Sequence, residues 1–307
     1  MKEKDFISII KTTLNSSYIG DDCALLKDLE IVVSQDSLVE GVHFSLDYTT
    51  PKQLGYKAVM TSVSDIAASG GKCMYLTISL SLPSDIDRAF VEELYKGAKS
   101  ACTEDIEIVG GDITGADKIF ISVCAIGSSK NRNISSRSKA KEGYKVIVFG
   151  EHGSSAAGLK ILQAKEGDVS VFAKEKMIKA HLEPVAYTDF GSLVGKTVKE
   201  EYAMMDTSDG LMDALSTIAN ESGVLLDIDF DKIPHDKNIE QFENWQNLVL
   251  FGGEDYGLVA VVPEKYDIGG IEIGQVKSGL GVDLKINNSI KHYSKQDVEN
   301  KIFNHFN

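Results

Sequence analysis

A polar segment at residues 128–143, SSKNRNISSRSKAKEG, separates two stretches in which strand-like and helix-like patterns alternate. Polar stretches with so little apolar content connect compact units more often than they lie inside one. We therefore predict an α+β chain of two domains, with residues 1–135 forming the first and residues 136–307 the second. A length of 307 residues suits this division.

Local patterns predict the elements of each half. Pro51 follows Thr50, as in a capped first helical turn, and the Gly70-Gly71 pair ends the apolar repeat that begins there. Alternation of apolar residues with Thr and Ser predicts a strand with one face in water. Strands are expected at 30–34, 76–82, 106–109, 119–127, 145–149, 224–228 and 258–262, and helices from Pro51, at 86–101, from Ser154 and after Gly210.

Charge and composition argue against several classes of partner. The net charge of −14 repels the phosphate backbone of nucleic acid. No run approaches the roughly 18 to 20 apolar residues of a membrane span, and the first residues do not resemble a secretory signal. The four cysteines form no CxxC pair, so a disulfide framework or zinc site is not indicated. We expect a cytoplasmic protein without membrane or nucleic-acid partners.

Two familiar motifs are incomplete. FGSLVGKT at 190–197 has one residue too few between its glycines for a phosphate-binding Walker loop, and Phe190 replaces the first glycine. The acidic ladder at Asp227, Asp229 and Asp231 lacks the glycine and the bidentate glutamate of a calcium loop. It is more typical of a strand end with solvated carboxylates.

Acidic residues recur beside glycines and hydroxyls at expected strand ends or helix starts. Asp, Ser and Gly are the common residues of turns and caps, so each such turn alone favours that simpler interpretation. Asp65 differs because it falls inside a helix, on the face shared with Ala58 and Ser62, where an unpaired charge is costly. Asp36 is expected to end a strand and Asp112 to follow one. Carboxylates gathered in this way need cations between them, and magnesium bridges carboxylates to phosphates. The pattern predicts a polyphosphate held by a carboxylate–magnesium cluster.

The same segments resemble the thiamine-monophosphate kinase family, within the superfamily of aminoimidazole-ribonucleotide synthetase. The resemblance follows the same order over nearly the whole chain and ends in KIFNHF (301–306). Its segments are IGDDCALL (19–26), VSQDSLVEGVHF (33–44), YKAVMTSVSDIAASGG (56–71), IVGGDIT (108–114), GSSAAGL (153–159), MDTSDGL (205–211) and FGGEDYGL (251–258).

The resemblance implies a fold and a reaction. The N-terminal strands of two subunits would form a barrel at a homodimer interface, and the C-terminal domain would be a layered α/β unit. The enzyme would make thiamine diphosphate from thiamine monophosphate and ATP by direct in-line transfer, with several Mg²⁺ ions. No catalytic base is assigned, because the attacking phosphate oxygen is already ionised at neutral pH.

The resemblance also implies site residues. Magnesium ligands would be Asp22, Ser34, Gln35, Asp36, Asp65, Asp112, Asp206 and Asp209. ATP contacts would be Tyr95, Gly111, Asp112, Arg137 and Ser208. His43, Glu254 and Phe303 would face thiamine monophosphate. An acidic or aromatic neighbour suits a cationic thiazolium ring, and Arg137 can bind phosphate with two parallel hydrogen bonds.

Three positions depart from the family pattern. Gln35 stands where threonine is usual, Ile113 replaces one threonine of GGDTT, and Gly257 replaces an acidic residue. None removes one of the carboxylates named above. Alternatives are another ATP-dependent synthetase of the superfamily, a binding module without transfer activity and a structural protein.

Overall fold

The computed structural model describes residues 3–163, 169–287, 289–303 and 305, and it contains two β-sheets. The elements up to residue 128 are α1 (Glu3–Leu14), β1 (Ala24–Leu26), η1 (Lys27–Leu29), β2 (Ile31–Val39), α2 (Pro51–Ser69), β3 (Lys72–Leu82), α3 (Arg88–Ala101), β4 (Glu107–Gly115) and β5 (Phe120–Ser128). Those after residue 143 are β6 (Tyr144–Phe149), α4 (Ser154–Leu162), α5 (Val171–Leu182), α6 (Thr188–Thr197), β7 (Ala203–Asp206), α7 (Leu211–Ser222), β8 (Leu225–Asp229), η2 (Phe230–Lys232), η3 (Lys237–Gln241), α8 (Trp245–Phe251), β9 (Leu258–Pro263), β10 (Ile271–Lys277), β11 (Gly281–Ile286), β12 (Ser289–Tyr293) and α9 (Lys295–Glu299).

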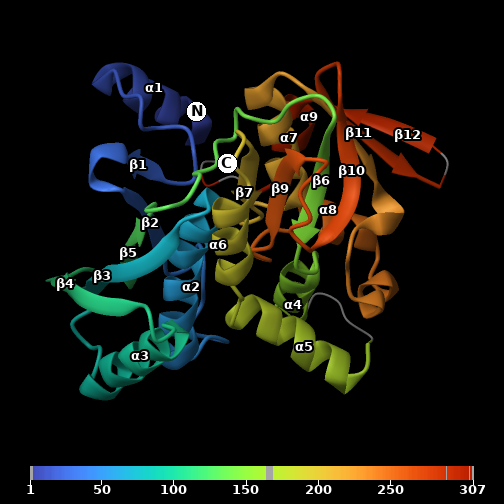
Figure 1. The fold of residues 1–307 in the computed structure, drawn as a ribbon. Helices are drawn as coiled ribbons and strands as arrows, with labels where there is room; N and C mark the ends of the chain where they lie inside the picture. Colours follow the sequence, from blue (N-terminus) through green and yellow to red (C-terminus); the bar gives the residue numbers. More distant parts are fainter. Residues whose placement is uncertain (1–2, 164–168, 288, 304, 306–307) are drawn as a thin grey trace.

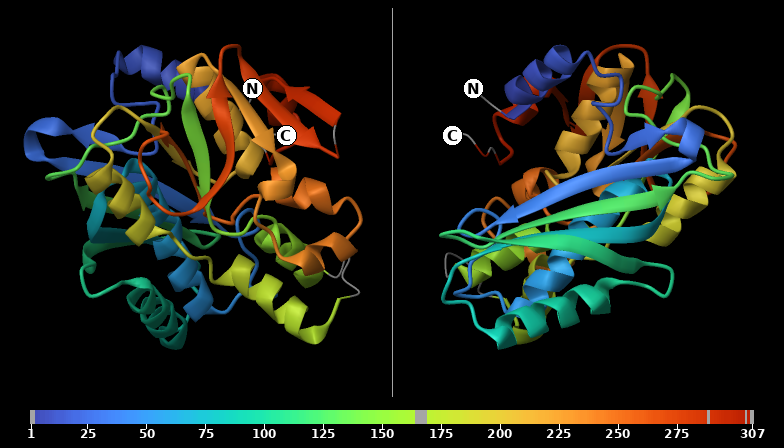
Figure 2. Two further views of the ribbon diagram at one scale, coloured as in Figure 1. Left: turned by 45° about the vertical axis from the view of Figure 1, so that its right-hand side comes forward. Right: turned by 90° about the vertical axis from the view of Figure 1, so that its left-hand side faces the viewer.

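The first sheet has five strands in the order β1-β2-β5-β3-β4, all antiparallel except the β3–β4 pair. Leu76, Ile78 and Leu80 of β3 are buried on the face that packs against helices, while Tyr75 on the other face is 40% exposed. The strands lie side by side in the right-hand view of Figure 2, with α3 along one side. This sheet is open in the described part of a single chain, so the expected barrel is not formed within one subunit.

The second sheet has seven strands in the order β12-β11-β8-β10-β6-β9-β7. One of its faces packs on α7, with Leu215 and Ile218 in a large apolar core. On the other face, Phe149 and Met204 contact Val194 of α6 and Ala67 of α2 in a separate core. Helices α2 and α6 therefore lie side by side between the two sheets, and α7 covers the far face of the second sheet, as can be followed in Figure 1. This arrangement confirms the α+β class.

Helix α2 occupies the middle of the molecule and starts as its sequence predicts. Thr50 and Gln53 form a reciprocal capping box, and Pro51 takes the first helical position. Gly70 ends the helix with φ 82°, a left-handed conformation that glycine adopts without strain. Because α2 packs between the two sheets, side chains at its buried positions can reach both halves of the chain.

Two glycines of the incomplete Walker motif have a packing role in α6. A Cβ at Gly191 would lie 2.1 Å from the carbonyl oxygen of Ala67, and one at Gly195 would lie 2.2 Å from that of Gly70. FGSLVGKT is therefore part of a helix that packs closely on α2, and the expectation that it is no phosphate loop is confirmed.

Several predicted boundaries were wrong. The strand expected at 30–34 continues to Val39, so Asp36 lies within β2 rather than at its end. Asp112 likewise lies within β4, which continues through both glycines to Gly115. Both strands continue through polar residues because only one face of the sheet is covered. The acidic ladder ends β8, as expected, with Asp229 capping η2.

The polar segment 129–143 contains no helix or strand, but it is held against both halves. Ser135 is buried and its hydroxyl donates to the carbonyl oxygen of Ala68 at 2.8 Å. Asn133 Nδ2 donates to the carbonyl oxygen of Glu200 at 2.6 Å. Its path is thus fixed by tertiary contacts.

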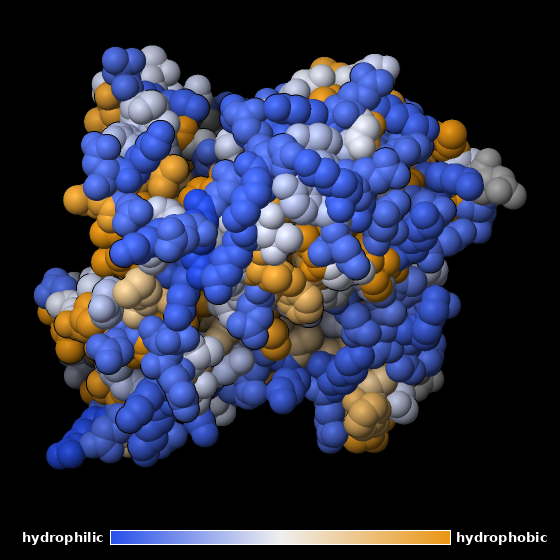
Figure 3. Space-filling model, in the orientation of Figure 1, coloured by the Kyte–Doolittle hydropathy of each residue, from blue (hydrophilic) through white to orange (hydrophobic). Residues whose placement is uncertain are grey.

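Hydrophilic residues cover most of the face seen in Figure 3, and hydrophobic ones gather along its left-hand side. Exposed apolar residues of the chain include Val109 and Ile113 of the edge strand β4. Across the described ranges, no helix combines the length and the apolar character needed to cross a membrane.

Candidate functional site: a carboxylate-lined cavity

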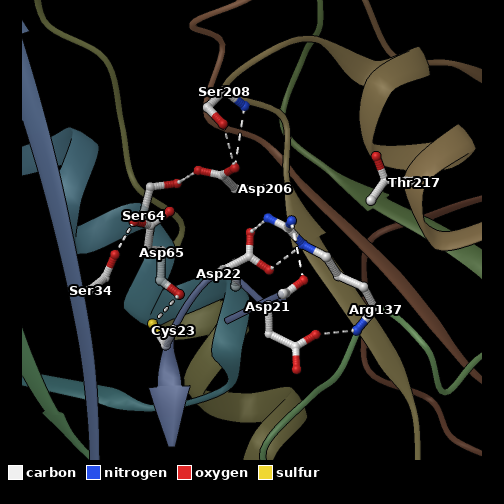
Figure 4. Close-up of polar contacts among 12 residues, drawn as sticks. Asp21, Asp22, Cys23, Ser34, Ser64, Asp65, Arg137, Asp206, Ser208 and Thr217 are labelled. Atoms are coloured by element: carbon white, nitrogen blue, oxygen red, sulfur yellow. Dashed lines mark hydrogen bonds and ion pairs between the residues drawn. The ribbon is translucent and has the colours of Figure 1, made fainter. Parts of the chain in front are cut away.

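Three aspartates from separate elements converge between the two sheets. Asp22 precedes β1, Asp65 lies in α2 and Asp206 ends β7. One carboxylate oxygen of each lies within 4.8 Å of the others. Figure 4 shows the three side chains pointing toward one another. The fold therefore brings together residues that are far apart in the sequence.

Hydroxyl groups orient these carboxylates. Ser34 donates to Asp65, as Figure 4 shows. The Ser64 hydroxyl donates to Oδ2 of Asp206 at 2.7 Å, and that of Ser208 donates to Oδ1 at 2.8 Å. These hydroxyl donors fix the directions of the Asp65 and Asp206 carboxylates but add no positive charge.

Arg137 is a cationic side chain at this cluster. Its Nη2 lies 3.0 Å from Oδ1 of Asp22 and its Nε lies 3.3 Å from Oδ2, while its backbone N–H donates to Asp21 at 2.8 Å. Burial alone would lower the pKa of Arg137, but the Asp22 carboxylate more than offsets this, so the guanidinium stays charged. Both interactions tie the polar segment to the start of β1.

Burial and mutual repulsion keep the carboxyl groups from ionising in their usual range. Burial, followed by the charges of Asp206 and Asp22, raises the pKa of Asp36 to about 7. Burial and Asp22 raise the pKa of Asp206 to about 6. The pKa of Asp65 is raised well above its ordinary value, first by burial and then by Asp36 and Asp206. The cluster therefore carries its full negative charge at neutral pH only when further cations are bound.

The donor set fits magnesium. Its atoms are carboxylate and hydroxyl oxygens, which hard divalent cations prefer. The three carboxylate oxygens are close enough to share one such ion. Their negative charges also outnumber the positive charge of Arg137, which contacts Asp22. No cysteine or histidine belongs to the described three-residue cluster, which argues against a zinc-type site.

A cavity of about 580 Å³ extends from this cluster. Asp36, Asp65, Ser208 and Asp209 line one part of it. Its other walls contain His43, Tyr48, Leu159, His181, Glu254 and Phe303. Three predicted metal ligands, Asp36, Asp65 and Asp209, thus line the same cavity as the predicted acceptor residues, and Asp22 and Asp206 lie next to Asp65. A second cavity, of about 380 Å³, lies among α7, β11, β12 and α9 and has none of the predicted site residues in its walls.

We call the part of the cavity that His43, Glu254 and Phe303, the predicted acceptor residues, line the acceptor end. Its wall is polar at Glu254 and His43. Glu254 has a φ of 64° and its N–H donates to the carbonyl oxygen of Ser208 at 2.6 Å. His43 accepts the N–H of Val39 at its Nδ1 over 3.0 Å, and its ring centroid lies 5.0 Å from that of His305. Phe303 is 62% exposed, so its ring is accessible to a ligand.

Four predicted site residues are not brought to the cluster. Gln35 is among the residues that line the cavity, but its amide donates to Ser122 at 3.0 Å on the uncovered face of the first sheet, opposite to Ser34 and Asp36. Asp112 is exposed in β4 and is paired with Ser79 on that same face. At Gly111 a Cβ would lie 1.8 Å from the carbonyl oxygen of Ile78, so close strand pairing explains this glycine. Tyr95 of α3 packs against the core of the first half.

Sequence reasoning missed two residues of the acceptor end. Lys57 Nζ lies 3.0 Å from Oε1 of Glu254, and His181 Nδ1 lies 3.3 Å from Oε2. No local sequence signal marked Lys57, which lies eight residues before Asp65 on a helix face that also carries Thr61. Asn304 and Phe306 of the C-terminal segment lie outside the described residues.

The fold and the cavity define a class of protein. Residues 20–129 match the family described as AIR synthase related protein, N-terminal domain. The structure is similar to that of AaThiL complexed with AMPPCP and TMP, with a TM-score of 0.87 and 34% identity, covering 99% of this chain and 97% of the other. The chain therefore has the AIR-synthase-related fold.

Curated relatives narrow the class to one family. The chain is 36% identical to a thiamine-monophosphate kinase of Aquifex aeolicus over 91% of this chain and 93% of the relative. It is 35% identical to a thiamine-monophosphate kinase of Bacillus subtilis over 85% and 84% of the two chains. The chain belongs to the thiamine-monophosphate kinase family, a family of phosphotransferases.

Proposed function

We propose that this enzyme transfers the γ-phosphate of ATP to thiamine monophosphate, forming thiamine diphosphate and ADP, and that the reaction depends on magnesium. The observation that carries the proposal is the single cavity with an aspartate cluster at one end and Glu254, His43 and Phe303 at the other. Family membership supports the same reaction, and AaThiL binds the two matching ligand types, AMPPCP and TMP.

Asp22, Asp36, Asp65, Asp206 and Asp209 are the proposed magnesium ligands at the cavity, with Ser34 beside them. When bound, magnesium neutralises the phosphate oxygens and stabilises the charge that develops during transfer. The protein itself supplies a fixed set of oxygens oriented by Ser64 and Ser208. Arg137 and Ser208 are the proposed contacts to ATP.

Transfer is proposed to be direct. An oxygen of the thiamine monophosphate phosphate forms a bond to the γ-phosphorus of ATP as the bond from that phosphorus to the β–γ bridging oxygen breaks, releasing ADP. The attacking oxygen is ionised at neutral pH, so the residues have to position two anionic groups rather than remove a proton. Glu254 is the proposed partner of the thiazolium cation, and Phe303 a ring against which it packs.

We further propose a homodimer that forms through the uncovered face of the first sheet, and two domains that meet near residue 135. Gln35 and Asp112 lie on that face. Their proposed magnesium contacts, and the proposed ATP contacts of Tyr95, Gly111 and Asp112, would then depend on the assembled dimer.

The test is to incubate the purified protein with ATP, Mg²⁺ and thiamine monophosphate and to separate the products by chromatography. We expect thiamine diphosphate and ADP in equal amounts, and EDTA should stop both. Stabilisation of the protein by ATP without any thiamine diphosphate would contradict the proposed reaction and favour another ATP-dependent member of the superfamily.

A further inference from the structure

Lys57 is a buried cation behind the acceptor end of the cavity. Its side chain is 1% exposed, and its ammonium lies 3.0 Å from Oε1 of Glu254. A lysine removed from water in this way needs a charged partner, because the cost of desolvation is otherwise several kcal/mol. Buried ion pairs are seldom needed for stability, since apolar residues of similar size stabilise a core as well or better. A role in ligand binding would explain why a charged residue is buried here.

Lys57 belongs to a helix face that follows the length of the cavity. Lys57, Thr61 and Asp65 are spaced by four residues and so lie along one face of α2. Thr61 and Asp65 line the cavity directly, and Lys57 stands behind Glu254. At 1.5 Å per residue, Lys57 and Asp65 are about 12 Å apart along the axis. One helix thus contributes to the aspartate cluster and to the acceptor wall.

Both carboxylate oxygens of Glu254 are held in place. Oε1 contacts Lys57, and Oε2 lies 3.3 Å from Nδ1 of His181, which in turn is 3.1 Å from the hydroxyl of Ser155. Burial would raise the pKa of Glu254, but Lys57 and then His181 hold it below its usual value. The side chain nevertheless remains 25% exposed, so a ligand in the cavity can reach it.

We propose that Lys57 is a positioning residue for acceptor binding, which acts by keeping Glu254 ionised and directed into the cavity; this rests on the proposed function, in which Glu254 meets the thiazolium cation. Lys57 partly offsets the negative charge of Glu254. Without it, however, a carboxylate so largely removed from water would take up a proton more readily and attract a cation less strongly. A paired, oriented carboxylate is therefore the better receptor for a cationic ring.

A double-mutant cycle on the full-length protein tests this role. The variants are Lys57→Met, which keeps most of the length of the side chain without its charge, Glu254→Gln and the combination of the two. Dissociation constants for thiamine monophosphate and for a non-hydrolysable ATP analogue, both with Mg²⁺ present, are measured by calorimetry. Lys72→Met is the matched control, because Lys72 pairs with Asp105 at 3.1 Å on the surface of the first half.

We expect Lys57→Met to weaken thiamine monophosphate binding about tenfold or more, which is the effect of losing about 1.4 kcal/mol. The same substitution made in the Glu254→Gln background should have almost no further effect, because the charge on which Lys57 acts is already absent. Binding of the ATP analogue should change less than twofold in all variants. Lys72→Met should bind both ligands like the wild type.

Any of three results would overturn the role of Lys57. One is wild-type binding of thiamine monophosphate by Lys57→Met. The others are equal loss from Lys57→Met in both backgrounds and equal loss for both ligands, as expected when the lysine only supports the fold. A wild-type protein that forms no thiamine diphosphate would instead overturn the proposed function, before any variant is compared.

Discussion

At the scale of single residues, the aspartate cluster was the most predictable part of the site. Asp65 could be identified from sequence because a charge within an apolar helix face has a cost that function must justify. Its neighbours could not be identified in the same way. Ser64 and Lys57 have polar side chains that look ordinary in sequence, and their importance depends on Asp206 and Glu254, which fold against α2 from the second half.

Replacing Asp65 by asparagine should remove activity without harming the fold. The amide oxygen of the new side chain could still accept the hydrogen bond of Ser34, and the neutral group would no longer repel Asp36 and Asp206. Loss of a metal contact worth several kcal/mol should lower kcat at least about 100-fold, at about tenfold for each 1.4 kcal/mol. Steady-state kinetics and thermal unfolding in the same buffer provide the measurement. Full activity in this variant would remove Asp65 from the cluster.

The raised pKa values predict how stability depends on pH in the absence of metal. An unfolded aspartate titrates near pH 4, whereas the pKa of Asp36 is raised to about 7 and that of Asp206 to about 6 in the folded chain. The folded state therefore binds protons more tightly over this window. The stabilisation is complete below about pH 4 and is lost as the pH rises through 7.

Thermal unfolding in EDTA between pH 5 and pH 8 checks this linkage. Wild type should lose more stability than Asp36→Asn over that range, by up to about 1.4 kcal/mol for each pH unit below the folded pKa. Added Mg²⁺ should stabilise the wild type more at pH 8 than at pH 6, because it binds the ionised carboxylates. Parallel pH profiles of the two proteins would show that Asp36 does not hold the proton.

At the scale of elements, sequence patterns predicted the helices and strands well where a whole face is buried. Helix α2 was correct from its cap at Thr50 to Gly70, because both ends carry their own chemical signals. Strands β2 and β4 were predicted too short because their second halves contain few apolar residues and are polar on one face. The Gly191 and Gly195 contacts of α6 depend on a helix more than a hundred residues earlier in the chain, and no local pattern indicates them.

Adding one methyl group at Gly191 tests the close packing of α6 on α2. Gly191→Ala would place a Cβ 2.1 Å from the carbonyl oxygen of Ala67, so one of the two helices must move. Alanine gains about 1 kcal/mol in helix propensity over glycine, but we expect a net loss of at least about 1 kcal/mol in the free energy of unfolding. Denaturant unfolding measures this difference. Gly115→Ala is the control, since a Cβ there meets no atom within 4 Å, and a more stable Gly191→Ala would contradict the packing described.

At the scale of the whole molecule, the sequence patterns and the resemblance to the family predicted the α+β class. The sequence could not show that the polar segment is held by Ser135 and Asn133, because both bond to backbone carbonyls supplied by distant elements. The division into two domains and the pairing of two chains remain predictions. The uncovered sheet face and the exposed apolar residues of β4 are the features that favour a second chain.

A charge on the uncovered face should prevent the proposed dimer. Tyr75 lies near the start of β3, the strand next to the edge strand β4, and is 40% exposed. We expect wild type to sediment at about twice the 33.4 kDa of one chain, and Tyr75→Glu to sediment as a monomer, because a buried unpaired carboxylate is costly at an interface. Analytical ultracentrifugation at several concentrations is the measurement. A dimer of unchanged affinity in Tyr75→Glu would place the contact elsewhere.

Helix α2 carries Asp65 toward the aspartate cluster and Lys57 toward the acceptor wall, and its backbone hydrogen bonds set the distance between them. In the proposed reaction, this helix would fix much of the distance between the donor and acceptor positions. An acceptor longer or shorter by one bond would then have to adapt its own conformation, and molecular length would itself be a criterion of substrate selection.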